Sequence, residues 1–341
     1  MMEFNILLVG CGGMSQAWVK YAIAREDCKI VGLVDIFEEN AKKLATLFDL
    51  NCPVFVDLVE AIQGTDANLV FDVTIPESHY KVATFAMQSG LDVLSEKPLA
   101  ASLEQAIEMV ATAKDNGRSY FIMQNRRYLK NIRAFQDVIK SGVIGETGFL
   151  CADFFLGPHF GGFRDIMDSP LILDMAIHTF DQARFLLGKD PVSVYCQEFN
   201  PPGSWYAGAA SAVCIFEFAN GSVFCYRGSW CAEGLNTSWE SEWRATGSRG
   251  TAIWNGSDMP YYEQVHSENK DDSSTQKGKV ISTFEWDGQE GHIGCFDEMF
   301  SALKEGRKAE TTCEDNIKSM EMVFAAIESS RTGKKVKLKN L

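Results

Sequence analysis

The sequence predicts two domains: a doubly wound α/β fold with a parallel sheet, then a domain with one large, mainly antiparallel open sheet covered by helices. Three observations support this prediction. Strand and helix patterns alternate over about the first 123 residues, strands separated by turns dominate from about residue 143, and 341 residues are too many for one ordinary core. We therefore expect one domain over residues 1–123 and a second over residues 124–341.

The order of elements defines the first domain. Short apolar runs between turn residues indicate buried strands, and segments with apolar residues three to four apart indicate helices. Ser102 and Gln105 have the spacing of a capping box at the start of the last helix. The expected strands are 6–9, 29–35, 53–56, 68–74, 91–95 and 119–125, and the expected helices are one around Trp18 and those at 37–48, 57–63, 77–89 and 102–117.

A glycine-rich turn, "VGCGGMSQ", joins the first strand to the first helix. Gly10 permits a tight turn, Gly12 lets the backbone approach a pyrophosphate, and the free N–H groups of the next helix can bind its oxygens. Ser15 replaces the third glycine of this fingerprint with another small residue. The pattern predicts a dinucleotide site to which Gly13 and Met14 also contribute.

Asp35 indicates which dinucleotide is bound. It ends the second strand at the expected distance beyond the glycines, where a carboxylate accepts hydrogen bonds from a ribose diol. The same carboxylate would repel a 2′-phosphate, and Ile36 supplies no compensating cation. NAD is therefore favoured over NADP, with Lys42 and Lys43 further along as the reason to keep NADP as an alternative.

Polar residues follow later strands at the edge where such sheets bind ligands. Thr74 and Pro76 follow one strand, and Glu96 and Lys97 follow the next. Because Pro98 restricts the residue before it, the Lys97 side chain starts from a narrowed set of directions. We interpret Lys97 as a functional group; the alternative is a solvated surface lysine.

Turn signals separate the strands of the second domain. Asn220-Gly221 is typical of a tight β-hairpin turn. Residues 256–279 are polar and are expected to form a long exposed loop, and a helix near 314–330 can return to the first domain. The expected strands are 146–156, 191–199, 211–219, 222–230, 238–246, 250–255 and 279–286.

One of these strands is apolar on both faces, with Val213 and Ile215 on one face and Phe216 on the other. A sheet with one solvated face alternates more cleanly. We expect helices 172–187 and 292–304 to cover one face and another subunit to cover the second. The result would be a homodimer or homotetramer.

Composition excludes several classes of partner. The formal net charge of −14, with a sequence pI near 4.9, disfavours nucleic acid and anionic membranes. Ten scattered cysteines show no CxxC pair, so we expect free thiols and no zinc site. The first residues lack a basic leader and a long apolar run, which predicts a cytoplasmic protein.

The segment "LILDMAIHTFDQARFLLG" places Asp174, His178 and Asp181 on one predicted helix face. A metal site and a purely structural helix are the alternatives to an acid/base role. Oxidation of a secondary alcohol needs a proton acceptor, and a neutral imidazole serves near pH 7. We assign His178 as the base and Asp174 as its positioning partner, with Lys97 as a donor to the reacting oxygen.

Contacts to the substrate are expected from four further residues. Arg127 follows a strand, Asp153 lies in "CADFFLG", and Phe163 and Arg164 lie in the aromatic segment "HFGGFR" with Phe160. Such side chains can hold hydroxyl groups and stack on an apolar ring face. Ordinary loop or core packing is the alternative for each.

Together, "VGCGGMSQ", "TIPESH", "SEKPLA" and "LDMAIHTFD" resemble the glucose–fructose oxidoreductase and inositol dehydrogenase (Gfo/Idh/MocA) family over nearly the whole chain. The resemblance implies a substrate pocket lined by Lys97, Asp174 and His178, and contacts near the nicotinamide from Thr74, Pro76 and His79. It also implies assembly through the open face of the second sheet. Glu96 and Lys97 of the EKP tripeptide are also expected beside the cofactor. Ala176 stands where many members have glycine.

These observations predict an NAD-linked dehydrogenase that moves hydride between a secondary alcohol of a cyclic polyol, sugar or sugar derivative and the nicotinamide. Two alternatives remain. One is a redox-neutral NAD-dependent glycosidase that uses the same residues, and the other is a non-catalytic dinucleotide-binding regulator, which would not need His178 or Lys97.

Overall fold

The computed structural model describes residues 3–265, 278–339 and 341, and the chain forms two compact units. The first unit contains Met1–Gln124 together with Cys295–Ile317. The second contains Asn125–Gly294 together with Lys318–Leu341. The expected single boundary near residue 123 is thus accompanied by a later segment that belongs to the first unit.

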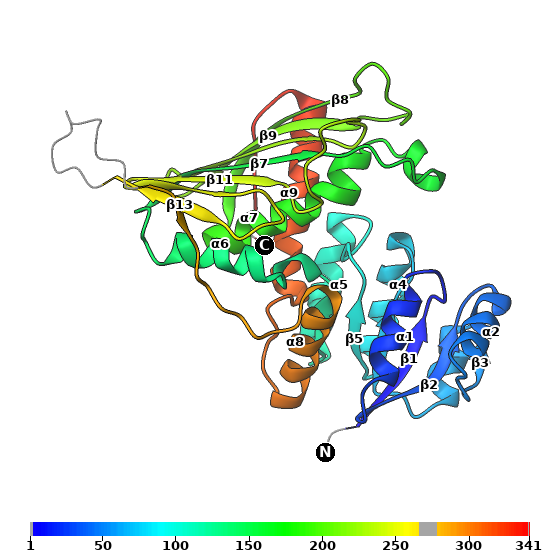
Figure 1. Ribbon diagram of the computed structural model, residues 1–341. Helices are drawn as coiled ribbons and strands as arrows, with labels where there is room; N and C mark the ends of the chain where they lie inside the picture. Colours follow the sequence, from blue (N-terminus) through cyan, green and yellow to red (C-terminus); the bar gives the residue numbers. More distant parts are fainter. Residues whose placement is uncertain (1–2, 266–277, 340) are drawn as a thin grey trace. The chain divides into compact units, whose positions relative to one another are not determined.

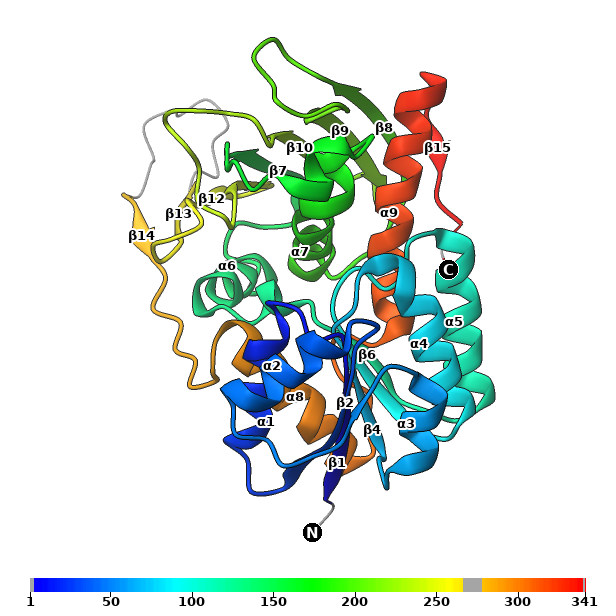
Figure 2. The ribbon, with the colours of Figure 1, turned by 90° about the vertical axis from the view of Figure 1, so that its right-hand side faces the viewer.

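The first unit is built on a six-stranded parallel sheet with the strand order β3-β2-β1-β4-β5-β6. This is the order of dinucleotide-binding folds. Figure 2 shows α1 and α8 beside one face and α4 and α5 beside the other. The elements are β1 Phe4–Val9, α1 Ser15–Ile23, β2 Cys28–Val34, α2 Glu38–Leu47, β3 Val54–Phe55, α3 Leu58–Gly64, β4 Leu69–Asp72, α4 Pro76–Gln88, β5 Asp92–Ser95, α5 Leu103–Asp115, β6 Tyr120–Ile122 and α8 Gly291–Glu305.

Helix α8 corrects one expectation, because it does not cover the second sheet. Its Phe296 ring stacks on Tyr21 with ring centroids 4.4 Å apart, and its Phe300 ring meets Phe4 edge-on at 4.9 Å. An apolar stripe shows that a helix face is buried, but it does not show against which sheet.

The second unit is built on a nine-stranded sheet with the order β14-β13-β12-β11-β7-β10-β9-β8-β15. Among the described strands of this sheet, β7 and β10 pair in parallel, and the other pairs are antiparallel. The elements are η1 Asn125–Arg127, α6 Lys130–Lys140, β7 Thr147–Phe155, η2 Gly162–Ile166, η3 Leu171–Ala176, α7 Ile177–Leu187, β8 Pro191–Phe199, β9 Ser211–Phe218, β10 Val223–Ser229, β11 Glu242–Gly247, β12 Gly250–Trp254, β13 Tyr261–Gln264, β14 Val280–Ile281, α9 Cys313–Thr332 and β15 Val336–Lys337.

The two faces of this sheet differ. Phe180 of α7 packs against Phe216 and Tyr226 on the inner face, with ring centroids 4.8 and 5.3 Å apart. On the outer face, Val213 and Ile215 are 37% and 41% exposed. Figure 1 shows α6 and α7 together on one side of this sheet. The fold places an apolar surface on the outer face.

Three local predictions in this unit were incomplete. Helix α6 was not predicted, although Ile132, Phe135 and Val138 have helical spacing and are buried. Strand β13 lies within the expected loop 256–279, because pairing with β12 makes a strand of a polar segment. Most of the rest of that loop, 266–277, lies outside the described residues, and the expected strand 279–286 is reduced to β14.

Candidate active site

The glycine-rich turn lies between β1 and α1, as expected. Gly10 has a φ of +90°, and a Cβ there would lie 2.6 Å from the Val73 carbonyl oxygen, so only glycine fits. A Cβ on Gly12 or Gly13 would meet nothing within 4 Å. The turn therefore leaves open space beside its backbone, as a bound pyrophosphate requires.

Ser15 occupies the position of the missing third glycine. Its side chain is fully buried, and its hydroxyl donates to the Gly12 carbonyl at 2.5 Å, which closes the turn. Met14 precedes the helix and contributes no side-chain cap. The helix N-terminus can therefore offer backbone N–H groups to an anion.

Asp35 lies at the end of β2 and connects two loops. Its Oδ2 accepts a hydrogen bond from the Cys11 amide at 2.8 Å, and its Oδ1 accepts one from the Phe37 amide at 2.8 Å. A carboxylate has acceptor sites for further donors. Asp35 thus holds the glycine-rich turn and retains the capacity to bind a ribose diol.

His79 and Thr74 both contact the buried carboxylate of Asp72 at the end of β4. Asp72 Oδ1 accepts from the Thr74 hydroxyl at 2.6 Å, and Asp72 Oδ2 lies 2.9 Å from His79 Nδ1. Burial alone lowers the pKa of His79, but Asp72 and Glu96 raise it above its ordinary value. Because His79 is fully buried, we interpret it as a support for the loop after β4, which contains Thr74 and ends where Pro76 begins α4.

The loop after β5 carries Glu96 and Lys97. The Trp18 indole N–H donates to Glu96 Oε1 at 2.8 Å, and the Lys97 amide donates to Glu96 Oε2 at 3.3 Å. The Lys97–Pro98 peptide bond is cis. Since β1, β2, β4 and β5 are parallel, the residues after them lie at one edge of the sheet, where such folds bind dinucleotides. The residues present fit a dinucleotide cofactor.

In the second unit, the "LDMAIHTFD" segment is not one regular helix. Asp174 lies in the π-helical turn η3, and His178 lies in the first turn of α7 and is buried. Arg164 Nε donates to Asp174 Oδ2 at 2.7 Å, while Asp181 binds Arg127. The two carboxylates that were expected on one helix face, Asp174 and Asp181, therefore bind different arginines. Single π-helical turns are frequent at functional sites.

Arg127 and Asp153 are both engaged in ion pairs, and the substrate contacts expected of them stay predictions. Arg127 donates twice to Asp181, each time at 2.6 Å, and is buried. Asp153 lies opposite Arg227 on neighbouring strands and binds its guanidinium. The sequence did not indicate these ion pairs, because the partner of each group lies on another element of the fold.

Phe163 and Arg164 do come together, beside Asp174. The Arg164 guanidinium lies 4.6 Å from the Phe163 ring centroid and 5.7 Å from that of Phe160. The aromatic segment is thus connected to the residue predicted to position the base.

Sequence reasoning missed a polar cluster beside α7. Gln182 Nε2 donates to Glu240 Oε2 at 2.7 Å, and Arg126 Nε lies 3.6 Å from Glu240 Oε1. Burial raises the pKa of Glu240 above its ordinary value. Gln182 could have been found from the sequence, because it lies one helical turn after His178. Nothing in the sequence connects Gln182 or Arg126 to Glu240.

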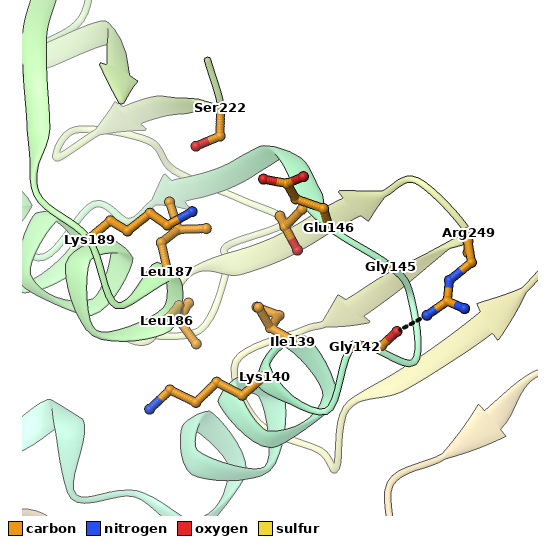
Figure 3. Close-up of a pocket in the computed structure, with 11 residues that line it drawn as sticks. Ile139, Lys140, Gly142, Gly145, Glu146, Leu186, Leu187, Lys189, Ser222 and Arg249 are labelled. Atoms are coloured by element: carbon orange, nitrogen blue, oxygen red, sulfur yellow. Dashed lines mark hydrogen bonds between the residues drawn. The ribbon is translucent and has the colours of Figure 1, made fainter. Parts of the chain in front are cut away.

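A surface pocket of about 340 Å³ lies elsewhere in the second unit (Figure 3). Lys140, Lys189, Glu146 and Arg249 line it, and Arg249 donates to the Gly142 carbonyl at 2.8 Å. Its lining contains none of the predicted site residues, so we assign it no part in the chemistry.

Among the described residues, no group of three or more His, Cys, Asp or Glu side chains is arranged to hold a metal ion. No helix found there has the length and apolar character needed to cross a membrane.

The chain is similar to known proteins in sequence and in fold. A model of the oxidoreductase family with an NAD-binding Rossmann fold matches residues 4–124, and one of the C-terminal alpha/beta domain of that family matches residues 166–338. The uncharacterized protein y4oX of Sinorhizobium fredii is 28% identical over 99% of this chain and 96% of its own. D-Apiose dehydrogenase of Paraburkholderia graminis is 24% identical over 99% and 91%.

A crystal structure of an oxidoreductase from Agrobacterium radiobacter, in complex with NAD⁺, L-tartaric acid and magnesium, has the same fold. Its TM-score is 0.85 at 22% identity, over 98% of both chains. The fold and the glycine-rich turn define an NAD-binding oxidoreductase. The chain belongs to the Gfo/Idh/MocA family, which confirms the resemblance and the predicted fold class.

Proposed function

We propose that the protein is a dehydrogenase that oxidises a secondary alcohol of a cyclic polyol, sugar or sugar derivative, with NAD preferred over NADP. The first unit would bind the cofactor and the second the substrate. The observation that supports this most is the combination of a dinucleotide turn with a buried histidine next to a π-helical turn. D-Apiose dehydrogenase, a relative over 99% of this chain, supports a sugar-like substrate.

Each catalytic group has one task. His178 takes the proton from the reacting hydroxyl, since a neutral imidazole is a competent base near pH 7. Lys97 donates a hydrogen bond to the same oxygen and offsets its developing negative charge. Asp174, which is held by Arg164, orients the imidazole of His178. When bound, the nicotinamide supplies the hydride acceptor.

The preference for NAD rests on Asp35. Its carboxylate follows β2 and already accepts two backbone hydrogen bonds, so its position is fixed before any cofactor binds. A fixed carboxylate attracts a ribose diol and repels a phosphate monoester. Ile36 beside it is exposed and uncharged.

We also propose that two copies of the chain associate through the outer face of the nine-stranded sheet. Phe149, Tyr195, Val213 and Ile215 lie on this face and are each more than a third exposed. Contiguous exposed apolar residues of this kind are typical of an interface. Sedimentation at micromolar concentration should show a dimer or tetramer, and a monomer would contradict the proposal.

The test of function uses the purified protein with NAD and a panel of inositols, aldoses and glycosides. Reduced-nicotinamide absorbance is followed while the glycosides are assayed for released sugar. Net reduction with one substrate class is the expected result. Released sugar without net reduction would replace the dehydrogenase with a redox-neutral glycosidase, and no reaction in either assay would favour a non-catalytic regulator.

A further inference from the structure

Two aromatic side chains from different loops form an exposed surface in the second unit. Strands β7 and β10 are parallel neighbours, so the segments that follow them leave the sheet at the same end. Phe160 follows β7 and Trp239 follows β10, and their rings stack with centroids 6.1 Å apart. Both rings also contact Trp230, which is buried. We name the pair Phe160 and Trp239 the aromatic shelf.

The aromatic shelf is exposed although its foundation is buried. The exposed fractions are 58% for Phe160 and 42% for Trp239. Large aromatic side chains that are held in place and still open to solvent indicate a binding surface more than a core. The sequence alone did not show this pair, because its members are far apart in the chain.

Polar contacts connect the aromatic shelf to the segment that carries His178. Four residues after Phe160, Arg164 binds Asp174, and directly after Trp239, Glu240 accepts from Gln182. Asp174 and Gln182 lie four residues before and four residues after His178. The main chain of Trp239 is held as well, since its carbonyl oxygen accepts a hydrogen bond from Arg126. The loops that carry Phe160 and Trp239 are therefore each hydrogen-bonded to a residue four positions from the proposed base, His178.

We propose that the aromatic shelf binds the apolar C–H face of the substrate ring and makes Trp239 and Phe160 the residues that select a ring over an open chain. The negative face of an aromatic ring attracts the weakly positive hydrogens of a sugar or cyclohexane ring. An open-chain polyol lacks a flat face of C–H bonds, so it gains less from this surface. The inference rests on the proposed function for the identity of the reacting group.

Binding measurements test the aromatic shelf without turnover. Myo-inositol, methyl β-D-glucopyranoside and the open-chain alditol D-glucitol are titrated into the protein loaded with NADH, which cannot accept a hydride from an alcohol, and saturation-transfer NMR reports affinity and the protons in contact. Trp239→Ala should weaken binding of the ring compounds about tenfold, the effect of losing one aromatic contact. Trp239→Phe should restore most of it. Phe160→Ala should resemble Trp239→Ala.

Ile166→Ala is the matched control, because Ile166 lies in the segment that follows Phe160, is 77% exposed and has no ring. It should bind all three compounds as the wild type does. Unchanged ring affinity in Trp239→Ala, equal wild-type affinity for D-glucitol, or no binding of either ring compound would overturn the proposal. So would a Trp239→Ala variant whose only change is a smaller sedimentation coefficient, because the shelf would then be an interface between copies. Ring binding through the shelf without any NAD reduction would instead refute the proposed dehydrogenase and leave the shelf intact.

Discussion

The two units build their candidate sites in different ways. In the first unit, the functional groups follow successive parallel strands, so their positions are set by short segments such as the glycine-rich turn and the loop that carries Lys97. In the second unit, groups are placed by partners far away in sequence: Gln182 and Glu240 are 58 residues apart, and Arg127 and Asp181 are 54 apart. The candidate site of the first unit can therefore be recognised from short segments of the sequence. The candidate site of the second unit depends on contacts that form only when the chain folds.

Replacing Lys97 tests whether the local site supplies chemistry as well as binding. Lys97→Ala should lower kcat by roughly a hundredfold to a thousandfold, the usual scale for loss of a donor to a developing negative charge. NAD affinity, measured by fluorescence titration, should change little, and Lys97→Arg should recover part of the rate. A kcat near that of the wild type would remove Lys97 from the mechanism.

Substitutions at two glycines of the same turn should distinguish an effect on folding stability from an effect on cofactor binding. Gly10→Ala should lower the free energy of unfolding by about 3 kcal/mol, because its Cβ would meet backbone at a positive φ. Gly12→Ala should change that free energy by less than about 0.5 kcal/mol, since its Cβ would enter open space, yet it should weaken NAD binding. Denaturant unfolding and NAD titration measure the two effects. Equal loss of stability in both variants would contradict this assignment.

The Asp35→Asn substitution tests whether this single residue of the first unit determines the preference for NAD over NADP. The amide retains one oxygen that can accept the Cys11 N–H but loses the charge that repels a 2′-phosphate. NAD affinity should fall and NADP affinity should rise, so that the ratio of their dissociation constants narrows by about tenfold. An unchanged ratio would place the ribose elsewhere.

The smallest expected effect concerns the pH dependence of stability. Neighbouring carboxylates raise the pKa of His79 in the folded protein, so its contribution to stability is complete below its ordinary pKa and is lost as the pH rises through the raised value. His79→Asn should therefore lose more stability at pH 6 than at pH 9. Denaturant midpoints at the two pH values provide the measurement, and an equal loss at both would exclude a charged His79.

The sequence could predict features that depend on short segments, but not those that depend on contacts between distant parts of the chain. The sheet of the first unit, the turn, Asp35 and Lys97 depend on short segments, and the structure contains all of them. The ion pairs of Arg127 and Asp153 could not be predicted, because the partner of each residue lies on another element. The aromatic shelf needed the same knowledge: Phe160 was a candidate from its segment, but Trp239 gained meaning only when β7 and β10 proved to be parallel neighbours.

The most direct test of the account is the rate of reduced-nicotinamide formation in a single turnover, compared between the wild type and His178→Ala across pH. The wild-type rate should rise with pH as one basic group loses its proton. In His178→Ala, that rise should be absent and the rate lower by a hundredfold or more. A variant with the wild-type rate and the same pH profile would contradict the assignment of His178 as the base.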